Sequence, residues 1–574
     1  MIKTRKIFLI AMATLLTITS CQEDVLETEN LSAYAEDSVF SDPDLLERVV
    51  FSAYNSTEGW ALNKTIWWSR RYNIEAGSFE AKFNFRDLDR LRLRGNGWTA
   101  QNEGDFRNKW RDNFRFVNEI NQFLDAVDDS PAMAEDPSRV NELKGEMKFL
   151  RANIYTKLIK MYGGVPIFST AFGLDSEFDV TRNTYQECVE FIVRELDEAA
   201  TLLPDSRPAN EFGRATRAAA LAVKSRTLLY AASKLHNSDT APNGPLYDYN
   251  VSSKWQDAAN AAKAVIDFYN KELIATPDAQ AYRNLFLSAN EDIIFARPYG
   301  GDLYDFGLDV NSLIDQTQSP PGYGGWAISS PSHNFALEFN MADGSTTDGA
   351  TYDSTDPNSN REMRYYAVMN FQGAMFRGRA IDYALSPDNP SFHGLDSPEG
   401  GSVGSPGNSL HSSKTGYNIR KFHNESLGSL TETTPGRPYI LYRLAEMFLN
   451  YAEAQYHLGN EDVAKTYLNK VSSRALQPQI TASGSDLLEA IKRERRIELA
   501  FEGHNFWDER RWMNTANLGF DIRGLKWKKD SSGNLLAPEE YTVVTRPWYD
   551  KQYYLPIPNT EVLKAPSLQQ NTGY

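Results

Sequence analysis

Apolar residues recur at alternating spacings of three and four along several stretches of the chain, the pattern of an amphipathic helix. The first clear stripe consists of Leu143, Met147, Leu150, Ile154, Leu158 and Met161. Gly163 and Gly164 follow it, and Pro166 comes next. Because glycine often occupies the residue after a helix and proline cannot continue one, the pattern predicts a helix that stops at the two glycines.

A second stripe follows and predicts a helical hairpin with the first. Its apolar positions are Val189, Ile192, Leu196, Ala199 and Leu203. Thr184, with Glu187 three residues later, predicts a capping box at the start of this helix, and Pro204 closes it. The helical pattern recurs at 216–235, 255–269, 443–458 and 461–474. A further stripe begins at Trp110 and continues through Phe114, Val117 and Asn121, which we interpret as core.

The recurring pairs predict a repeat architecture. Residues 452–459, with Ala464 and Leu468, resemble a tetratricopeptide repeat, whose small alanines let two helices approach closely. One such pair cannot bury its apolar face alone, so several stack around a continuous core. The predicted fold class is mainly α: a tetratricopeptide-like helical repeat scaffold. We expect one domain over 41–574, with repeat halves at about 41–270 and 437–574.

Between about 275 and 436 the periodicity fails, and the composition shifts to Gly, Pro, Ser, Asn and aromatic residues. The run PPGYGGW at 320–326 cannot lie inside a helix. A structureless segment of this length is normally functional or disordered, and its many aromatic residues argue against disorder. We therefore expect a large loop-rich insertion that carries function.

The first twenty residues predict a lipoprotein signal peptide. Three basic residues (Lys3, Arg5 and Lys6) precede an apolar stretch, residues 1–20 contain no acid, and the stretch is too short for a membrane span. The sequence LLTITS then leads into Cys21, which resembles a lipobox, so we expect Cys21 to be acylated. Lipid chains on one cysteine give stable membrane attachment. Polar residues 21–40 predict a flexible tether.

Charge and cysteine content narrow the possible partners. Removing residues 1–20 takes away three positive charges, so the net charge changes from −16 to −19. Such a surface argues against nucleic acid and anionic lipid headgroups as ligands, so the membrane is reached only through the lipid anchor. If Cys21 carries lipid, Cys188 is left alone and no disulfide can form within the chain.

The strongest candidates for catalysis are Glu494, Glu498 and Glu502, at successive spacings of four. Glycosidases need paired carboxylates, yet these three are interleaved with arginines, which favours ion pairing. Glu446 and Glu453 lie on a predicted repeat helix and receive the same interpretation.

No motif predicts a cofactor. The seven histidines contain no HExxH pair, and the chain has no GxxxxGK loop. Asp353, Asp356 and Asn358 fall short of a calcium loop and favour a solvated turn. The sequence leaves a structural calcium ion open. We therefore expect no cofactor and no enzymatic activity.

Four ordered segments and the C-terminal tail resemble the SusD/RagB family. They are EMKFLRA (146–152) with YGGVP (162–166), GRAT (213–216), RLAEMFLNYAEA (443–454), ERRIELAFEG (494–503) with WD (507–508) and RRW (510–512), and the tail LPIP (555–558) with QNTGY (570–574). Together they span most of the chain after the signal peptide.

The resemblance implies a SusD-like α/α superhelix and an outer-membrane lipoprotein exposed at the cell surface. In that family four tetratricopeptide-like units support a loop-rich half. The repeat side packs as a lid on a SusC-like TonB-dependent β-barrel transporter, and the loop-rich side binds glycan. The expected function is therefore capture of an oligosaccharide or polysaccharide and its delivery to such a transporter.

Glycan contacts are expected from aromatic rings and planar polar groups in loops, because sugar CH faces stack on rings and hydroxyls bond to amides and guanidinium groups. Two clusters qualify, one N-terminal and one in the insertion. The candidates are Trp67, Arg71, Trp98, Asn102, Tyr304, Tyr323 and Trp326. The family resemblance points to Trp98, Asn102, Tyr304 and Trp326 in particular.

Three alternatives stay open. The chain could be the peptide-binding subunit of a RagAB-like peptide importer, a surface glycoside hydrolase with acids in the insertion, or a repeat scaffold that binds peptide in a helical groove. The sequence does not identify the glycan, its linkage or length, or the partner transporter.

Overall fold

The computed structural model describes residues 36–57, 74–84, 97–106, 108–173, 179–237, 239, 242–298, 303–304, 308–385, 395–396, 412–432 and 437–574. The α-helices in this part of the chain are α2 (Glu36–Val39), α3 (Pro43–Ala53), α4 (Lys109–Ala126), α5 (Pro131–Glu135), α6 (Pro137–Tyr162), α7 (Tyr185–Leu202), α8 (Arg217–Ala232), α9 (Lys254–Tyr269), α10 (Ala279–Asn284), α11 (Val310–Gln318), α12 (His333–Ala336), α13 (Met363–Val368), α14 (Leu444–His457), α15 (Glu461–Arg474), α16 (Gly484–Glu498), α17 (Asn505–Arg511), α18 (Thr515–Leu518) and α19 (Asn559–Lys564).

Short strands and 3₁₀ turns make up the remaining regular structure. The strands are β1 (Ala81–Phe83), β2 (Ile293–Arg297), β3 (Leu303–Tyr304), β4 (Leu308–Asp309), β5 (Ser329–Pro331), β6 (Met369–Asn370), β7 (Met375–Phe376), β8 (Arg379–Ala380), β9 (Asn418–Ile419), β10 (Tyr439–Arg443), β11 (Phe520–Lys526) and β12 (Glu539–Arg546). The 3₁₀ turns are η1 (Tyr54–Ser56), η2 (Ile74–Gly77), η3 (Gly104–Phe106), η4 (Ala209–Glu211), η5 (Lys234–His236), η6 (Pro321–Tyr323) and η7 (Asp550–Tyr553). These strands form antiparallel two-stranded pairs.

Helix α6 begins at an aspartate cap followed by a proline and ends at a glycine. The Asp136 side chain accepts a hydrogen bond from the Arg139 N–H, and Pro137 occupies the first turn, where its missing N–H costs nothing. Gly163 follows the helix with φ 77°, and a Cβ there would lie 2.7 Å from the carbonyl oxygen of Leu246. Both the backbone angle and the close approach require glycine, so the predicted stop is confirmed.

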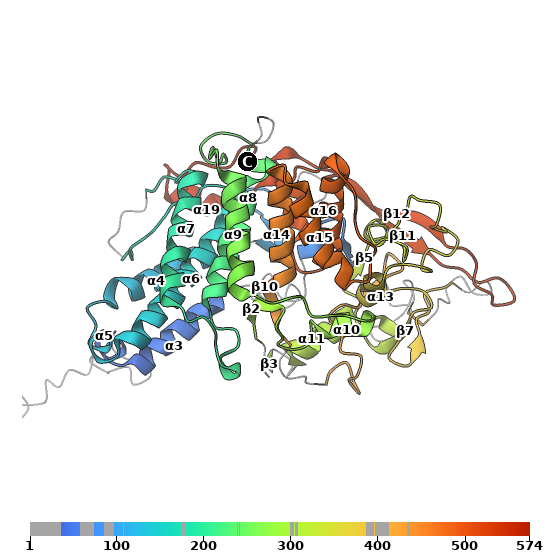
Figure 1. The fold of residues 1–574 in the computed structure, drawn as a ribbon, viewed down its shortest axis with the longest axis horizontal. Helices are drawn as coiled ribbons and strands as arrows, with labels where there is room; N and C mark the ends of the chain where they lie inside the picture. The colour runs from blue at the N-terminus through green and yellow to red at the C-terminus, as the bar shows by residue number, and fades with distance from the viewer. Residues whose placement is uncertain are drawn as a thin grey trace, which may run out of the picture.

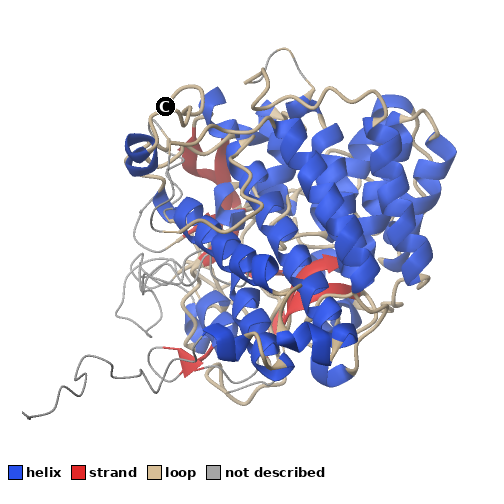
Figure 2. Cartoon of the chain, turned by 90° about the vertical axis from the view of Figure 1, so that its left-hand side faces the viewer, coloured by secondary structure: helices blue, strands red, loops and turns tan. Residues whose placement is uncertain are grey.

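The predicted helical stack is confirmed (Figure 1). The capping box of Thr184 and Glu187 is present at the start of α7. Helix α6 packs on α7, α7 on α8, α8 on α9, and α14 on both α15 and α16. Figure 2, turned by 90° from Figure 1, shows helices lying side by side over much of the molecule. In α4, Trp110, Phe114, Val117 and Asn121 are all buried, as predicted.

The chain leaves the stack after α9 and rejoins it at α14. Helices α9 and α14 nevertheless pack directly on each other, so the two groups of repeat helices are continuous in space. Strand β2, early in the insertion, pairs with β10 at its end: Ile440 lies opposite Ala296 and Tyr439 opposite Arg297. This pairing closes the insertion at its base.

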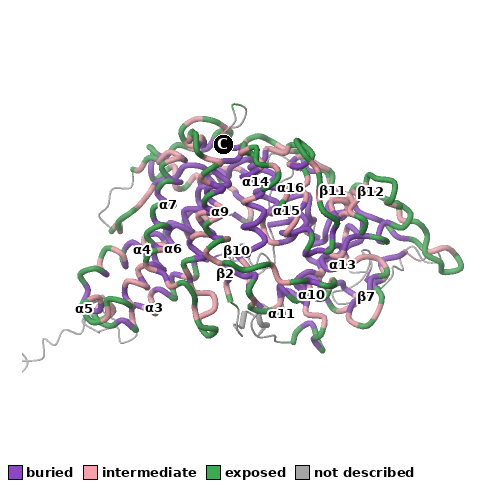
Figure 3. Tube along the Cα trace, in the orientation of Figure 1, coloured by how far each residue is buried: buried purple, intermediate pink, exposed green. Residues whose placement is uncertain are grey.

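The insertion contains more regular structure than predicted. Helices α10 to α13 lie in it, each of nine residues or fewer among the described residues, which is too short to show a clear helical period. They surround a second apolar core that includes Tyr282, Phe335, Tyr365, Phe376 and Tyr417. Figure 3 shows buried chain continuing from the helices into this half, with exposed loops around it.

The folded body begins before the predicted end of the tether at residue 40. Helix α2 already spans Glu36–Val39, and the ring of Phe40 packs against Phe123 with centroids 6.1 Å apart. The apolar contacts of Val39 and Phe40 with the core anchor this segment.

Cys188 lies buried in α7, where it is a free thiol. Its Sγ–H donates to the Val165 carbonyl, and burial raises the pKa of the thiol to about 12. The group therefore stays protonated and unreactive at neutral pH.

Candidate functional site

The aromatic loop of the insertion, residues 319–328, reverses tightly after α11 and runs back along it. The N–H groups of Trp326, Ala327 and Ile328 donate to the carbonyls of Gln316, Ser319 and Thr317, at 2.8, 3.0 and 2.8 Å. These backbone bonds give the loop a defined shape, so rings that it carries are held in place rather than free to collapse.

Tyr323 is fixed in this loop by both its hydroxyl and its ring. The hydroxyl lies 2.8 Å from the Phe376 carbonyl and 3.1 Å from the Arg379 carbonyl, and the Arg379 guanidinium carbon lies 3.8 Å from the ring centroid. The ring meets Phe376 edge-on at 5.0 Å. Burial raises the pKa of Tyr323 to about 12, so the phenol stays neutral. The side chain is half-buried and leaves part of its surface open.

Trp326 is also half-buried and lies three residues beyond Tyr323. Between them, Gly325 comes so close to the preceding chain that a Cβ would lie 2.1 Å from the Ser319 carbonyl oxygen. The approach of backbone to backbone at Gly325 therefore sets the position of Trp326.

Replacing Gly325 with alanine is expected to destabilise the protein by about 2 kcal/mol, because the added methyl group must displace the Ser319 backbone. Gly173→Ala is the matched control, since a Cβ there meets no atom of the described residues within 4 Å. Urea unfolding of both variants measures the difference. Equal midpoints for the two variants would show that the loop yields without cost.

Asn84, which lies between the two stretches of the predicted N-terminal cluster in the sequence, contacts the aromatic loop of the insertion. Asn84 donates through its backbone N–H to the Ile328 carbonyl at 2.7 Å and through Nδ2 to the Ala327 carbonyl at 2.7 Å. Strand β1 pairs with β5 in the same place. A second contact links the insertion to the N-terminal part of the chain: Arg297, at the end of β2, donates to the Thr57 carbonyl at 3.2 Å. The N-terminal segments thus lie beside the chain that flanks the insertion's aromatic loop.

Several predicted site residues fall outside the described structure. Trp67 and Arg71 lie between residues 57 and 74, and Cys21 precedes residue 36. Tyr304 belongs to strand β3, but its side chain is outside the described part. Their predicted roles stay predictions.

Trp98 does not lie in an exposed loop, so that expectation is wrong. The side chain is 1% exposed and packs against Phe106 and Phe506, with ring centroids 5.7 and 6.5 Å away. The Arg510 guanidinium lies 5.8 Å from its ring. These neighbours cover the indole and leave no face on which a sugar could stack.

Asn102 belongs to the same N-terminal turn as Trp98. Its Oδ1 accepts from the Gly104 N–H at 3.1 Å, and its backbone pairs with Thr99. The turn packs against the C-terminal segment, where Asn559 N–H donates to Ala100 at 2.8 Å and Lys551 Nζ to Trp98 at 3.3 Å. Asn102 therefore has a structural role in this turn, and these contacts are not with the loop at 319–328.

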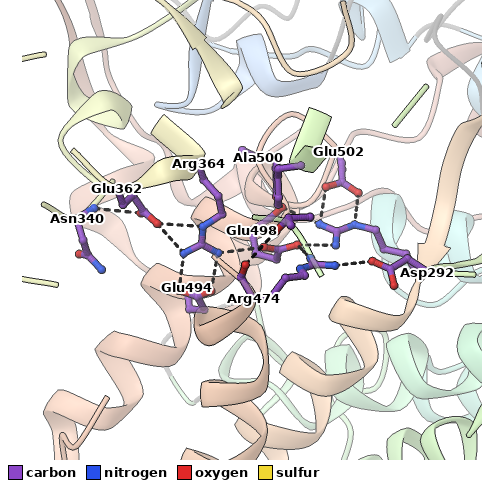
Figure 4. Close-up of polar contacts among 12 residues, drawn as sticks. Asp292, Asn340, Glu362, Arg364, Arg474, Glu494, Glu498, Ala500 and Glu502 are labelled. Carbon is purple, nitrogen blue, oxygen red and sulfur yellow. Dashed lines mark hydrogen bonds and ion pairs between the residues drawn. The ribbon is translucent and has the colours of Figure 1, made fainter. Parts of the chain in front are cut away.

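The three glutamates first considered for catalysis form buried ion pairs, as predicted (Figure 4). Arg364 donates to Glu494 at 2.6 Å and to Glu498 at 3.0 Å, while Arg443 reaches Glu498 and Glu502, each at 2.7 Å. The partners come from α13 and from the β10–α14 junction, not from the interleaved arginines. Those turn to other elements: Arg495 pairs with Asp508, and Arg496 with Glu509 and Glu338.

The glutamates of this network are buried and paired with guanidinium groups. Burial by itself would raise the pKa of Glu498, but the guanidinium groups of Arg474, Arg443 and Arg364 outweigh it and hold that pKa well below its usual range. Glu446 pairs with Arg226, and Glu453 with Arg511, as expected for structural pairs. A general acid needs a proton near neutral pH and access to substrate, and Glu498 has neither.

A hollow in the loop-rich half escaped the sequence reasoning. It has a volume of about 520 Å³ and is lined by parts of three segments: the turn at 355–360, residues 366–373, and the arm at 527–537. Its aromatic lining is Tyr366, Phe371 and Trp527. Because the third segment lies more than 150 residues from the other two, no local pattern marked it.

The described residues contain no group of three or more His, Cys, Asp and Glu side chains that could hold a metal ion. Within the same residues, no helix is both long enough and apolar enough to cross a membrane.

Comparison with known families decides what this architecture is. Residues 291–574 match the model of the SusD family, and residues 24–229 match a model described as starch-binding and associating with the outer membrane. The two matches cover most of the chain. The chain belongs to the SusD/RagB family.

Individual members of the SusD/RagB family are distant in sequence. A SusD-like protein of Formosa agariphila is 24% identical over 81% of this chain and 79% of its own length. The crystal structure of a SusD-like protein of Bacteroides fragilis matches with a TM-score of 0.74 at 25% identity, over 94% of this chain and 99% of that one.

Two further structures bear names that state a ligand class. A SusD-like carbohydrate-binding protein of Bacteroides fragilis has a TM-score of 0.73 at 22% identity and covers 92% of this chain and 100% of its own. A laminarin-binding SusD-like protein has a TM-score of 0.63 at 19% identity and covers 93% of this chain and 100% of its own. These likenesses confirm the predicted SusD-like helical fold.

Proposed function

We propose that this protein is a binding subunit at the outer membrane that captures an oligosaccharide or polysaccharide and delivers it to a SusC-like TonB-dependent transporter. The observation that carries the proposal is the aromatic loop at 319–328. It presents two half-buried rings, Tyr323 and Trp326, on a backbone held by its own hydrogen bonds. A rigid ring can stack on the CH face of a sugar without first losing conformational freedom.

The surroundings of this loop suit a neutral, hydroxyl-rich ligand. The Arg379 guanidinium under Tyr323 is already paired with Asp396 at 2.8 Å, so it adds a planar stacking surface and no unpaired charge. The carbohydrate-binding and laminarin-binding structures that share this fold support a glycan as cargo.

Delivery and attachment are part of the same proposal, and family membership supports them. In the proposal, acylated Cys21 holds the protein at the membrane, and the rigid helical stack acts as a lid over the transporter. The partner supplies the energy for uptake, so this subunit needs no catalytic residue. Peptide cargo is the main alternative, and a surface glycoside hydrolase is the second.

Trp326→Ala is expected to weaken glycan binding about tenfold, a loss typical of one aromatic contact. The protein without residues 1–21 is tested by affinity gels and calorimetry against a panel of polysaccharides and oligopeptides. Trp255→Ala is the matched control: this half-buried tryptophan lies on α9 of the repeat scaffold, stacked on His457 at 3.9 Å.

Retention on one polysaccharide without product release, weakened by Trp326→Ala and not by Trp255→Ala, supports the proposal. Binding of oligopeptides alone would establish peptide import instead. Release of free sugar would establish a hydrolase.

A further inference from the structure

The 520 Å³ hollow in the loop-rich half is built on a braced turn. The Arg361 guanidinium donates to the carbonyls of Pro357 and Phe339, at 2.9 and 2.8 Å. The backbone N–H of Arg361 donates to the Tyr366 hydroxyl at 3.0 Å. That hydroxyl donates in turn to the Asn358 carbonyl at 3.0 Å. The turn at 355–360 is thus tied to the protein core and does not need a ligand to shape it.

The side-chain amide of Asn358 has N–H donors that the described protein groups do not use. Asn358 is 8% exposed, lines the hollow, and accepts at Oδ1 from the hydroxyl of buried Tyr365 at 2.6 Å. Within the described part of the chain, its Nδ2 group donates to no protein acceptor. A largely buried amide that is oriented by one bond and left with two free N–H donors is suited to a ligand oxygen.

The lining as a whole matches a neutral saccharide. Phe371, which stacks on Tyr365 at 5.3 Å, and Tyr366 offer ring surface beside the amides of Asn358 and Gln372. Of the described lining residues, only Asp356 carries a charge, and none is Lys or Arg. Phosphate, sulfate or uronate groups would therefore meet no cation, whereas hydroxyl groups meet donors and acceptors.

The hollow is connected to the aromatic loop by a short stretch of chain. Phe371 lines the hollow, and the carbonyl of Phe376 holds the Tyr323 hydroxyl. Five residues of extended chain span at most about 18 Å, which limits the distance between these two positions. This span is within the length of a glycan of several sugar units.

We propose that the hollow lined by Asn358, Tyr366, Phe371 and Trp527 is a second subsite for a neutral glycan, which holds a further part of the chain engaged at Tyr323 and Trp326. This assignment rests on the proposed function. Its consequence is that affinity depends on glycan length, because only a long chain gains from both positions.

Asn358→Asp tests the subsite with little change in shape. The aspartate keeps an oxygen for the Tyr365 hydroxyl and replaces the free N–H donors by an acceptor. We expect about tenfold weaker binding of the long polysaccharide retained in the panel, with unchanged binding of its shortest retained oligosaccharide. Asn260→Asp on α9 is the matched control, since its Oδ1 accepts from Gln256 in the same way on the repeat scaffold.

Calorimetry with both ligands and a thermal melt of each variant separate the outcomes. If Trp326→Ala weakens binding and Asn358→Asp does not, the subsite is refuted while glycan capture stands. If the unsubstituted protein binds no glycan, both proposals fail. Oligopeptide binding that Asn358→Asp weakens would make the hollow a peptide site, and equal losses for long and short glycans would refute the extended chain.

Discussion

Glu498→Gln is expected to lower the free energy of unfolding by about 3–5 kcal/mol, which is typical of removing one partner from a buried ion pair. Glu498 is fully buried and lies between Arg364 at 3.0 Å, Arg443 at 2.7 Å and Arg474. Glutamine keeps the shape but removes the negative charge. Three buried guanidinium groups would then lose one of the negative charges that balance them, in a region with little water.

The location of this network explains why the effect should be global. Arg364 belongs to α13 in the insertion, whereas Glu494 and Glu498 lie on α16 of the C-terminal helices. Asp292, next to strand β2, pairs with Arg474, which also contacts Glu498 (Figure 4). The charges thus join the loop-rich half to the helical stack.

Glu489→Gln supplies the matched control for this prediction. It makes the same change on the same helix, but Glu489 is exposed and, among the described residues, pairs only with Lys492. Exposed pairs contribute about 0–1 kcal/mol. Urea unfolding of both variants decides the question, and similar losses would show that burial of the Glu498 charge adds nothing to stability.

Glu75→Gln is expected to make the protein more stable at pH 7.5 by up to about 3 kcal/mol and to change little at pH 4.5. Burial, opposed by backbone hydrogen bonds and reinforced by the charge of Glu502, raises the pKa of Glu75 from 4.5 to about 7. Glu80, also buried, has a raised pKa for the same primary reason. The second oxygen of each carboxyl has no hydrogen-bond partner among the described residues.

The direction of the effect follows from the two protonation states. Since the folded-state pKa lies above the unfolded value, the neutral carboxyl contributes stability that is fully present below about pH 4.5. That contribution is lost as the pH rises through about 7, where Glu75 must carry a buried charge. Glutamine stays neutral throughout, so the variant does not suffer this loss.

Urea unfolding of both proteins between pH 4.5 and 7.5 measures the difference. This range lies below the pKa of buried Lys421, which burial lowers to about 8 despite the charge of Glu502. Glu489→Gln again controls for the loss of an exposed carboxylate. A stability difference between Glu75→Gln and the unsubstituted protein that does not change with pH would contradict the prediction.

Much of the helical scaffold could be predicted because its determinants are local. The stripe from Leu143 to Met161, the capping box at Thr184 and the stop at Gly163 all act within about four residues, the reach of one helical turn. The ordered set of short segments that resemble the SusD/RagB family also predicted the family correctly. The same reasoning favoured ion pairing over catalysis for Glu494, Glu498 and Glu502, although it could not name their partners.

In the loop-rich half, the sequence did not predict which aromatic residues would stay exposed. Tyr323 and Trp326 were singled out by residue type, and the structure places both in one braced loop. Trp98 was singled out in the same way and is buried, because Phe106 and the distant Phe506 cover it. An aromatic residue outside a periodic stretch carries no local sign of whether another segment will pack over it.

The sequence by itself determined the helices, their capped ends and the family to which the protein belongs, since each depends on neighbouring residues or on an ordered set of short segments. Tertiary structure alone decided that α9 lies against α14, that Arg364 and Arg443 meet Glu498, and that Asn358 and Trp527 line one hollow. These contacts join segments that are far apart in the chain, and they form only when the two apolar cores pack together and bring those segments into reach.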